Sequence, residues 1–171
     1  ETDILHPLDK ISHVMGVYKE LFPEIPRWQQ EVRLQADKDG FLRNAFGYIL
    51  RFSRVFVWKK ENGQWVKELG EEAEAVLAFK PQSNTSAIIK EVMLRLYFDI
   101  FEEAGQYLRL QLHDELFSEV PDPLLERVSR VMQEEMERPI PQLALPESYG
   151  MGPYLTINTE AKQAKRWGEM H

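Results

Sequence analysis

Three consecutive polar residues, His113, Asp114 and Glu115, separate two runs of alternating apolar side chains. Polar groups between apolar strands are costly unless they face water or bind a ligand. The two adjacent carboxylates repel each other, and a divalent cation would relieve that repulsion; oxygen ligands of this kind suit Mg²⁺. Because successive side chains on a strand point to opposite faces, one ion would take only one carboxylate directly, unless a turn relaxes this limit. The tripeptide therefore indicates either a magnesium-binding tip or an ordinary solvated turn.

The segments on either side of the tripeptide are typical of two strands. Residues 107–112 alternate, with leucines on one face and Arg109 and Gln111 on the other, and residues 116–120 alternate again. Strands joined by a tight turn must be antiparallel. We therefore expect the tripeptide at the tip of a hairpin.

Helices are expected before and after this hairpin. An apolar stripe predicts a long helix over residues 85–104, ended by Gly105. A second amphipathic helix is predicted over 123–136, followed by an extended, proline-rich loop over 139–153 and a last strand over 154–158. An antiparallel sheet with helices packed on it is an α+β arrangement, which is the fold class we expect.

In the first half of the chain, the spacing of apolar residues changes once, from helical to strand-like. Helical spacing predicts helices over residues 8–21 and 27–37, with a break at the prolines between them and Gly40 as a left-handed cap. A strand-rich stretch over 41–56 follows, with Gly47 in a turn. We therefore expect a helical part that leads into hairpins.

Asn62-Gly63 lies between two β-rich runs, which is a strong hairpin signal. Each run carries a tryptophan, Trp58 in the first and Trp65 in the second. We expect these two rings to pair across the strands, and prefer this to a role in base stacking.

Composition narrows the function classes. The chain has 171 residues, of which 43% are hydrophobic, and no Cys. This excludes a disulfide framework, a thiolate zinc site and a cysteine nucleophile. No apolar run approaches the length of a membrane span, so we expect no membrane partner.

The charge is uneven along the chain. The net charge is −7, yet eight basic and three acidic residues lie between Arg33 and Lys67. That stretch therefore carries +5 and the remainder −12. The asymmetry indicates either one basic face on an acidic body or a solvated hairpin with lysines on its edges.

The stretch 110–120, Leu-Gln-Leu-His-Asp-Glu-Leu-Phe-Ser-Glu-Val, resembles the third palm motif of the family A DNA polymerases, the DNA polymerase I type. That motif has the pattern apolar-Gln-apolar-His-Asp-Glu-apolar-x-x-Glu-Val. Upstream, the stretch 82–90 is similar to the family's Gln-Gly-Thr-Ala-Ala-Asp-Ile-Ile-Lys helix start, with Ser83 in place of a Gly and Ala87 in place of an Asp.

Three weaker similarities occur in the same order as in the family. Residues 22–25 resemble its Tyr-Pro-Gly-Val, and residues 40–48 resemble its Gly-Tyr-Val…Gly-Arg hairpin, with Tyr48 where an Arg is usual. Residues 167–170 resemble its closing Asn-Trp segment. The hairpin around Asn62-Gly63 is longer than expected at that place in the family, as an insertion would be.

The resemblance implies roles for the tripeptide. Asp114 would be one of two aspartates that hold a catalytic pair of Mg²⁺ ions for phosphoryl transfer. Glu115 would be a secondary catalytic carboxylate, and His113 would lie near the primer terminus.

The resemblance also implies contacts with DNA. Gln82, at the start of a helix, would reach the minor groove and check the shape of a base pair without reading sequence. Arg51 and Arg54 would contact backbone phosphates.

The implied organisation is a helical and hairpin part of the fingers over residues 1–70 and the C-terminal part of the palm over residues 71–171. The family's first aspartate and its nucleotide-binding helix are missing from the sequence. We therefore expect activity only with an N-terminal polymerase polypeptide, on primer-template DNA and deoxynucleoside triphosphates, in the nucleoid or host-cell cytoplasm.

The rival interpretations are a non-catalytic accessory subunit, a metal-dependent hydrolase that uses the same carboxylates, and synthesis on an RNA template.

Overall fold

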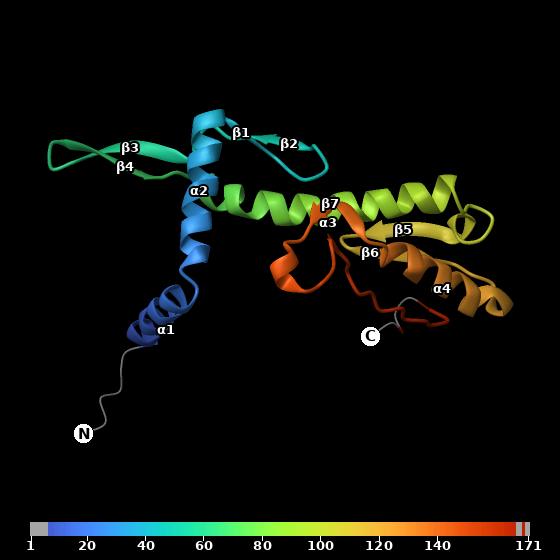
Figure 1. Ribbon diagram of the computed structural model, residues 1–171. Helices are drawn as coiled ribbons and strands as arrows, with labels where there is room; N and C mark the ends of the chain where they lie inside the picture. Colours follow the sequence, from blue (N-terminus) through green and yellow to red (C-terminus); the bar gives the residue numbers. More distant parts are fainter. Residues whose placement is uncertain (1–6, 167–168, 170–171) are drawn as a thin grey trace, which may run out of the picture. The chain divides into compact units, whose positions relative to one another are not determined.

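A computed structural model describes residues 7–166 and Glu169 (Figure 1). The chain divides into two compact units. The first comprises the described residues up to Asn44 together with Ile49–Pro81, and the second comprises Ala45–Tyr48 and the described residues from Gln82 onward. None of the helices in the described part combines the length and apolar character that crossing a membrane requires.

The first unit begins with two helices, α1 (Pro7–Leu21) and α2 (Glu24–Asp39). Helix α2 starts three residues before the predicted position, because Pro26 falls in its first turn, where a backbone N–H has no acceptor within the helix. Gly40 ends α2 with φ 71°, and its N–H donates to the carbonyl oxygen of Ala36 at 2.9 Å. The predicted left-handed cap is confirmed.

Two separate hairpins follow, β1 (Phe41–Arg43) with β2 (Ile49–Arg51), and β3 (Phe56–Glu61) with β4 (Gln64–Leu69). Asn62 and Gly63 both have positive φ, 48° and 85°, as a two-residue type I′ turn requires. Both predicted hairpins are confirmed.

The predicted pairing of Trp58 with Trp65 is wrong. The register places Trp58 opposite Lys67 and Trp65 opposite Lys60, so the two rings are diagonal neighbours on one face. A cross-strand partner is set by the turn, and the two-residue turn at Asn62-Gly63 fixes a register in which the tryptophans are not directly opposite each other.

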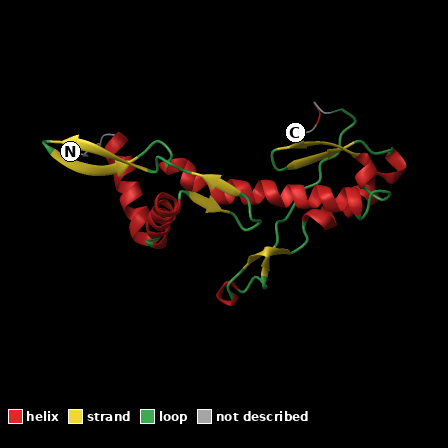
Figure 2. Ribbon diagram, turned by 90° about the horizontal axis from the view of Figure 1, so that it is seen from above, coloured by secondary structure: helices red, strands yellow, loops and turns green. Residues whose placement is uncertain are grey.

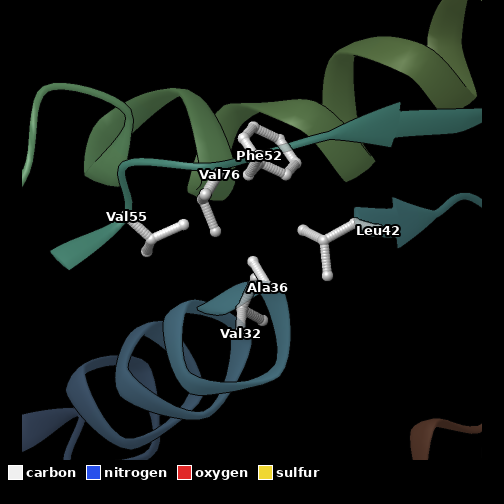
Figure 3. Close-up of a cluster of buried hydrophobic side chains, with 6 residues drawn as sticks. All are labelled: Val32, Ala36, Leu42, Phe52, Val55 and Val76. Atoms are coloured by element: carbon white, nitrogen blue, oxygen red, sulfur yellow. The ribbon is translucent and has the colours of Figure 1, made fainter. Parts of the chain in front are cut away.

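The core of the first unit joins these elements. Helix α2, the strand-rich stretch and the start of α3 (Ala73–Phe98) each contribute side chains, which point toward one another in Figure 3. The buried residues are Val32, Ala36, Leu42, Phe52, Val55 and Val76. Phe79 of α3 adds an edge-on contact with Phe52, with 6.2 Å between ring centroids.

Helix α3 differs from its prediction at both ends. It starts twelve residues before residue 85 and ends six before residue 104. The residues ahead of Pro81 are strong helix formers, and they carry the helix through the proline, which occupies an interior position. The stretch 82–90 therefore lies inside a helix and does not open one.

Gly105 also has another role than the predicted one. It lies seven residues beyond the end of α3, and a Cβ there would stand 2.0 Å from the carbonyl oxygen of Leu96. Only a glycine allows this approach of two backbone segments.

The second unit contains two more hairpins and the helix α4. Its elements after α3 are η1 (Gly105–Tyr107), β5 (Leu108–Leu112), β6 (Glu115–Ser118), η2 (Asp122–Leu124), α4 (Leu125–Met136), β7 (Ile140–Ala144), η3 (Glu147–Tyr149) and β8 (Tyr154–Leu155). The predicted loop over 139–153 thus contains a strand, β7, whose partner β8 is shorter than predicted.

Helices and antiparallel hairpins occur together, which agrees with the expected α+β class. A continuous antiparallel sheet is not what the described residues form. Each of the four sheets has two strands, drawn as separate yellow pairs in Figure 2.

Helices α3 and α4 pack together in the core of the second unit. The buried residues are Val92, Leu96, Ala104, Val128 and Met132. Leu108 and Leu116 pack against them from β5 and β6, so this core holds the hairpin that carries the tripeptide.

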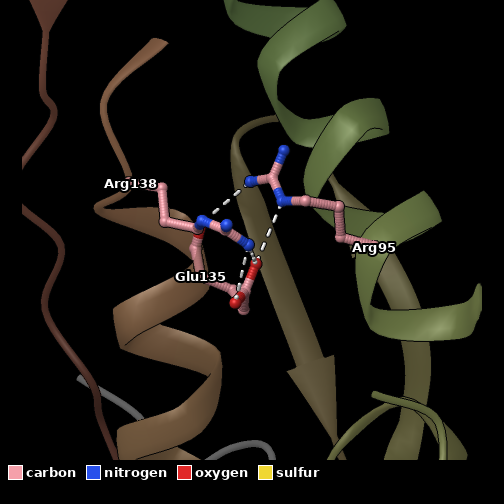
Figure 4. Close-up of polar contacts among 3 residues, drawn as sticks. All are labelled: Arg95, Glu135 and Arg138. Carbon is pink, nitrogen blue, oxygen red and sulfur yellow. Dashed lines mark hydrogen bonds and ion pairs between the residues drawn. The ribbon is translucent and has the colours of Figure 1, made fainter. Parts of the chain in front are cut away.

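An ion-pair cluster reinforces the same packing (Figure 4). Arg95 of α3 donates from Nε to the Glu135 carboxylate of α4 at 3.0 Å, and from Nη2 to the Glu135 carbonyl oxygen at 2.9 Å. Arg138 donates to both carboxylate oxygens at 3.1 and 2.9 Å. Burial alone would raise the pKa of Glu135, but the hydrogen bonds from Arg138 and Arg95 outweigh it and lower that pKa below its usual value.

This cluster predicts a pH-dependent stability. A carboxyl group with a lowered native pKa adds stability that is present above its unfolded pKa and lost as the pH falls through the native pKa. We expect Glu135→Gln to lower the free energy of unfolding by about 1.5 kcal/mol at neutral pH and by less at pH 3. Urea titrations at both pH values measure this.

Glu134→Gln is the matched control, because Glu134 is an exposed neighbour whose contact with Arg130 is 3.8 Å. Such exposed pairs contribute little. An equal loss from both substitutions, or a loss by Glu135→Gln that does not shrink in acid, would contradict the role of the cluster.

Candidate active site at the His-Asp-Glu turn

The tripeptide lies at the tip of the β5–β6 hairpin, as predicted. Leu112 and Glu115 are register partners, so His113 and Asp114 form a two-residue turn and Glu115 is the first residue of β6. His113 has φ 53°, which residues other than glycine adopt uncommonly. The Gln111 amide donates to the His113 carbonyl oxygen and helps to hold this conformation.

All three residues of the tripeptide are exposed. Exposure removes the cost of placing polar groups between apolar strands. The exposure of these residues is therefore what an ordinary solvated turn would also show. The feature that goes beyond a solvated turn is the cavity beside it.

Asp114 and Glu115 line a cavity of about 570 Å³ within the second unit. Volumes of this order are typical of ligand sites. The apolar side of the cavity comes from α3, through Ile88, Ile89 and Val92. One exposed carboxylate-bearing turn therefore faces a space large enough for a ligand.

The C-terminal segment also lines the cavity, through residues that include Glu160 and Lys162. The C-terminal end of helix α4 holds this segment, because the N–H and hydroxyl of Thr159 donate to Oε1 of Glu137, the C-cap residue, at 2.8 and 3.0 Å. Gln133 donates to the Thr159 carbonyl oxygen at 2.8 Å. The backbone hydrogen bond from Thr159, followed by that from its hydroxyl, lowers the pKa of Glu137.

Sequence reasoning missed Glu160 and Lys162. Residues 159–166 lie beyond the predicted last strand and form neither helix nor strand, and a long-range contact between Thr159 and Glu137 holds this segment. No local pattern could have found these two residues.

The tripeptide fits magnesium in the kind of its donors, because Asp114 and Glu115 offer carboxylate oxygens. The described residues do not, however, gather three or more His, Cys, Asp or Glu side chains into one group that could hold a metal ion. Metal binding by Asp114 therefore stays a prediction for the part of the chain that the structure describes.

The remaining predicted site residues do not line this cavity. Gln82 is exposed in the interior of α3, so its predicted place at a helix start is wrong, and the cavity lining does not include it. His113 shares the turn with Asp114 but is not among the residues that line the cavity.

Arg51 and Arg54 belong to the first unit, where Arg51 is exposed at the end of β2. Arg54 forms an exposed ion pair with Glu71 at 2.8 Å. The backbone N–H groups of Arg54 and Ser53 donate to Glu72 and lower the pKa of its carboxyl group. Exposed pairs exchange readily, so Arg54 keeps its capacity to meet another anion.

Comparison with known proteins agrees with the motifs. The sequence model of the family described as DNA polymerase family A matches residues 6–169. The chain is 29% identical over 146 residues to the thermostable DNA polymerase I of Thermus aquaticus, which covers 85% of this chain. It is 31% identical over 148 residues to a thermostable DNA polymerase I of Thermus thermophilus, again over 85% of this chain.

The chain spans 17% of the length of each of these two relatives. No solved structure matches it. Of the similar segment at residues 167–170, only Glu169 lies within the described residues. Because the family sequence model covers nearly the whole sequence, the chain belongs to DNA polymerase family A.

Proposed function

We propose that this chain is part of a template-directed DNA polymerase and supplies one half of its nucleotidyl-transfer site. The observation that carries this proposal is the exposed Asp114-Glu115 turn beside a ligand-sized cavity in a chain of this family. The other half would come from polypeptide that carries the first aspartate and the nucleotide-binding helix, either in the same chain or in a separate one.

In this proposal Asp114 is the magnesium ligand and Glu115 tunes the site from beside it. Bound Mg²⁺ supplies charge neutralisation at the reacting phosphate and lowers the pKa of the attacking hydroxyl. The chain itself contributes position: the packed β5–β6 hairpin holds the backbone of the turn that carries Asp114, and a preorganised site needs little reorganisation during the reaction. His113, at positive φ on the same turn, would donate to the primer terminus.

We further propose that residues 1–70 serve as part of the fingers and residues 71–171 as part of the palm. Arg51 and Arg54 would contact phosphates of the primer-template, and Gln82 would reach its minor groove from an exposed position inside α3. The protein would act where DNA is replicated, in the nucleoid or the host-cell cytoplasm.

A primer-extension assay tests the shared site. We expect no incorporation by the 171-residue chain by itself, because a single carboxylate turn cannot hold two ions in the geometry of phosphoryl transfer. Incorporation should appear when the chain is combined with a polypeptide that carries the missing aspartate and nucleotide-binding helix.

Three outcomes would contradict the proposal. Robust incorporation by the chain alone would show that its site is complete. Hydrolysis of small phosphate esters without a template would indicate a metal-dependent hydrolase. Full activity of the combined polymerase after Asp114→Ala would indicate an accessory subunit. Parallel assays on DNA and RNA templates establish which template is copied.

A further inference from the structure

One face of the β3–β4 hairpin gathers tryptophan and lysine side chains. Side chains alternate between the two faces of a strand, so Trp58 and Lys60 share a face. The register places Lys67 opposite Trp58 and Trp65 opposite Lys60, on that same face. We call these four residues the Trp–Lys face.

Both tryptophans are unusually open to solvent. The exposed fraction is 64% for Trp58 and 66% for Trp65, although tryptophan is on average a highly buried residue. Neither ring forms an aromatic contact with another ring in the described part of the chain. Packing within the hairpin therefore does not explain why two tryptophans occur at these positions.

Charge is segregated between the two faces of this hairpin. Its acidic residues, Glu61 and Glu68, lie on the opposite face, where Glu68 pairs with Lys59 at 2.5 Å. On the Trp–Lys face, Lys60 has no ion-pair partner among the described residues. A surface with two exposed rings and an available cation fits a partner that is anionic and carries flat aromatic groups.

The hairpin is held so that the Trp–Lys face stays open. Lys67 pairs with Asp37 of α2 at 2.8 Å and lies 4.4 Å from the centroid of the Phe56 ring. These contacts hold the hairpin within the first unit at the level of Trp58, the register partner of Lys67, while Lys60 and Trp65 pair two positions nearer the Asn62-Gly63 turn.

We propose that the Trp–Lys face binds the unpaired template strand of the primer-template; this inference rests on the proposed polymerase function. Exposed aromatic rings stack on unpaired bases of any sequence, and nearby cations contact the phosphates between them. A duplex fits less well, because its bases already stack on one another. The template overhang is the source we favour, since every primer-template substrate carries one, whereas a displaced strand needs a second strand downstream.

The test measures binding of the full chain to a labelled oligo(dT) by fluorescence anisotropy. We expect Trp58→Ala and Trp65→Ala each to weaken binding about 10-fold. Trp58→Phe and Trp65→Phe should retain most of the affinity, because a phenyl ring still stacks. Circular dichroism of each variant confirms that the hairpin and helices remain folded.

Lysine variants provide a matched pair on the two faces. Lys60→Gln is expected to reduce the salt dependence of binding by about 0.7 in the slope of log K against log salt, the value for one phosphate contact on a single strand. Lys59→Gln removes the same charge from the opposite face and should leave the slope unchanged. Equal effects of the two substitutions would show that net charge matters and the Trp–Lys face does not.

Binding to two further DNA substrates identifies the ligand. A primer-template with a long 5′ template overhang should bind more tightly than the same duplex with blunt ends, and the tryptophan variants should abolish the difference. Equal binding of the two substrates, equal affinity of wild type and alanine variants, or a requirement for a downstream displaced strand would each overturn the proposal.

The inference and the proposed function can fail separately. Loss of template binding in the tryptophan variants, with full polymerase activity after Asp114→Ala, would support the Trp–Lys face and contradict the catalytic role. Unchanged binding in those variants, with activity lost after Asp114→Ala, would support the catalytic role of Asp114 and contradict the Trp–Lys face.

Discussion

Replacing Asp114 with Asn reduces nucleotide incorporation by the assembled polymerase about 1,000-fold or more, if this carboxylate holds the catalytic metal. Metal coordination contributes several kcal/mol to the stabilisation of such a transition state, and each 1.36 kcal/mol corresponds to a tenfold change in rate. The substitution keeps the size of the side chain but removes its charge. Single-turnover primer extension measures the chemical step directly.

Glu119→Gln is the matched control for Asp114→Asn. Glu119 follows β6 of the same hairpin, and its carboxylate is exposed and 3.4 Å from Arg109. It does not line the cavity, so its replacement should leave the rate nearly unchanged. Glu115→Gln should have an intermediate effect of about 10-fold, which is typical of residues that support a metal ligand. A rate within a few-fold of wild type after Asp114→Asn would contradict the catalytic assignment.

Leu96→Ala is expected to lower the free energy of unfolding of the second unit by about 2–5 kcal/mol. The Leu96 side chain has no exposed surface, and it lies in the core that α3 shares with α4 and the β5–β6 hairpin. Removing it deletes buried methyl groups and leaves a cavity beside a closely approaching backbone at Gly105. Urea unfolding followed by circular dichroism measures the loss.

Leu94→Ala provides the comparison on the same helix. Leu94 is 52% exposed, so its replacement should change the stability by less than about 0.5 kcal/mol. If Leu96→Ala and Leu94→Ala lower the free energy of unfolding equally, burial of Leu96 in the core of α3, α4 and the β5–β6 hairpin does not stabilise the second unit. Asp114 depends on this core, and Leu96→Ala should therefore also reduce polymerase activity at elevated temperature.

Features fixed by a few adjacent residues could be predicted from the sequence. Gly40 caps α2, and Asn62-Gly63 turns the β3–β4 hairpin, because each conformation needs a positive φ that these residues accept. The tripeptide lies at a hairpin tip because alternating side chains on both sides specify strands. Its position beside a cavity depends on the packing of α3, which local patterns do not encode.

Features fixed by competition or by distant contacts could not be predicted. The apolar stripe predicted a helix that starts at residue 85, but the helix formers before Pro81 carry α3 through that proline, so Gln82 lies in the helix interior. Glu160 and Lys162 line the cavity, and their segment is held by the hydrogen bond from Thr159 to Glu137, two residues that are 22 positions apart. The two tryptophans are separated by a register that only the turn geometry determines.

The central claim is that Asp114 forms one half of a cation site whose other half lies on another stretch of polypeptide. Titration of Mn²⁺, which accepts the same oxygen ligands as Mg²⁺, with detection of bound ions by electron paramagnetic resonance, tests it most directly. We predict tight Mn²⁺ binding by the assembled polymerase with primer-template and nucleotide, weak binding by this chain alone, and loss of bound ions after Asp114→Asn. The same number of tightly bound ions in the Asp114→Asn polymerase would contradict the claim.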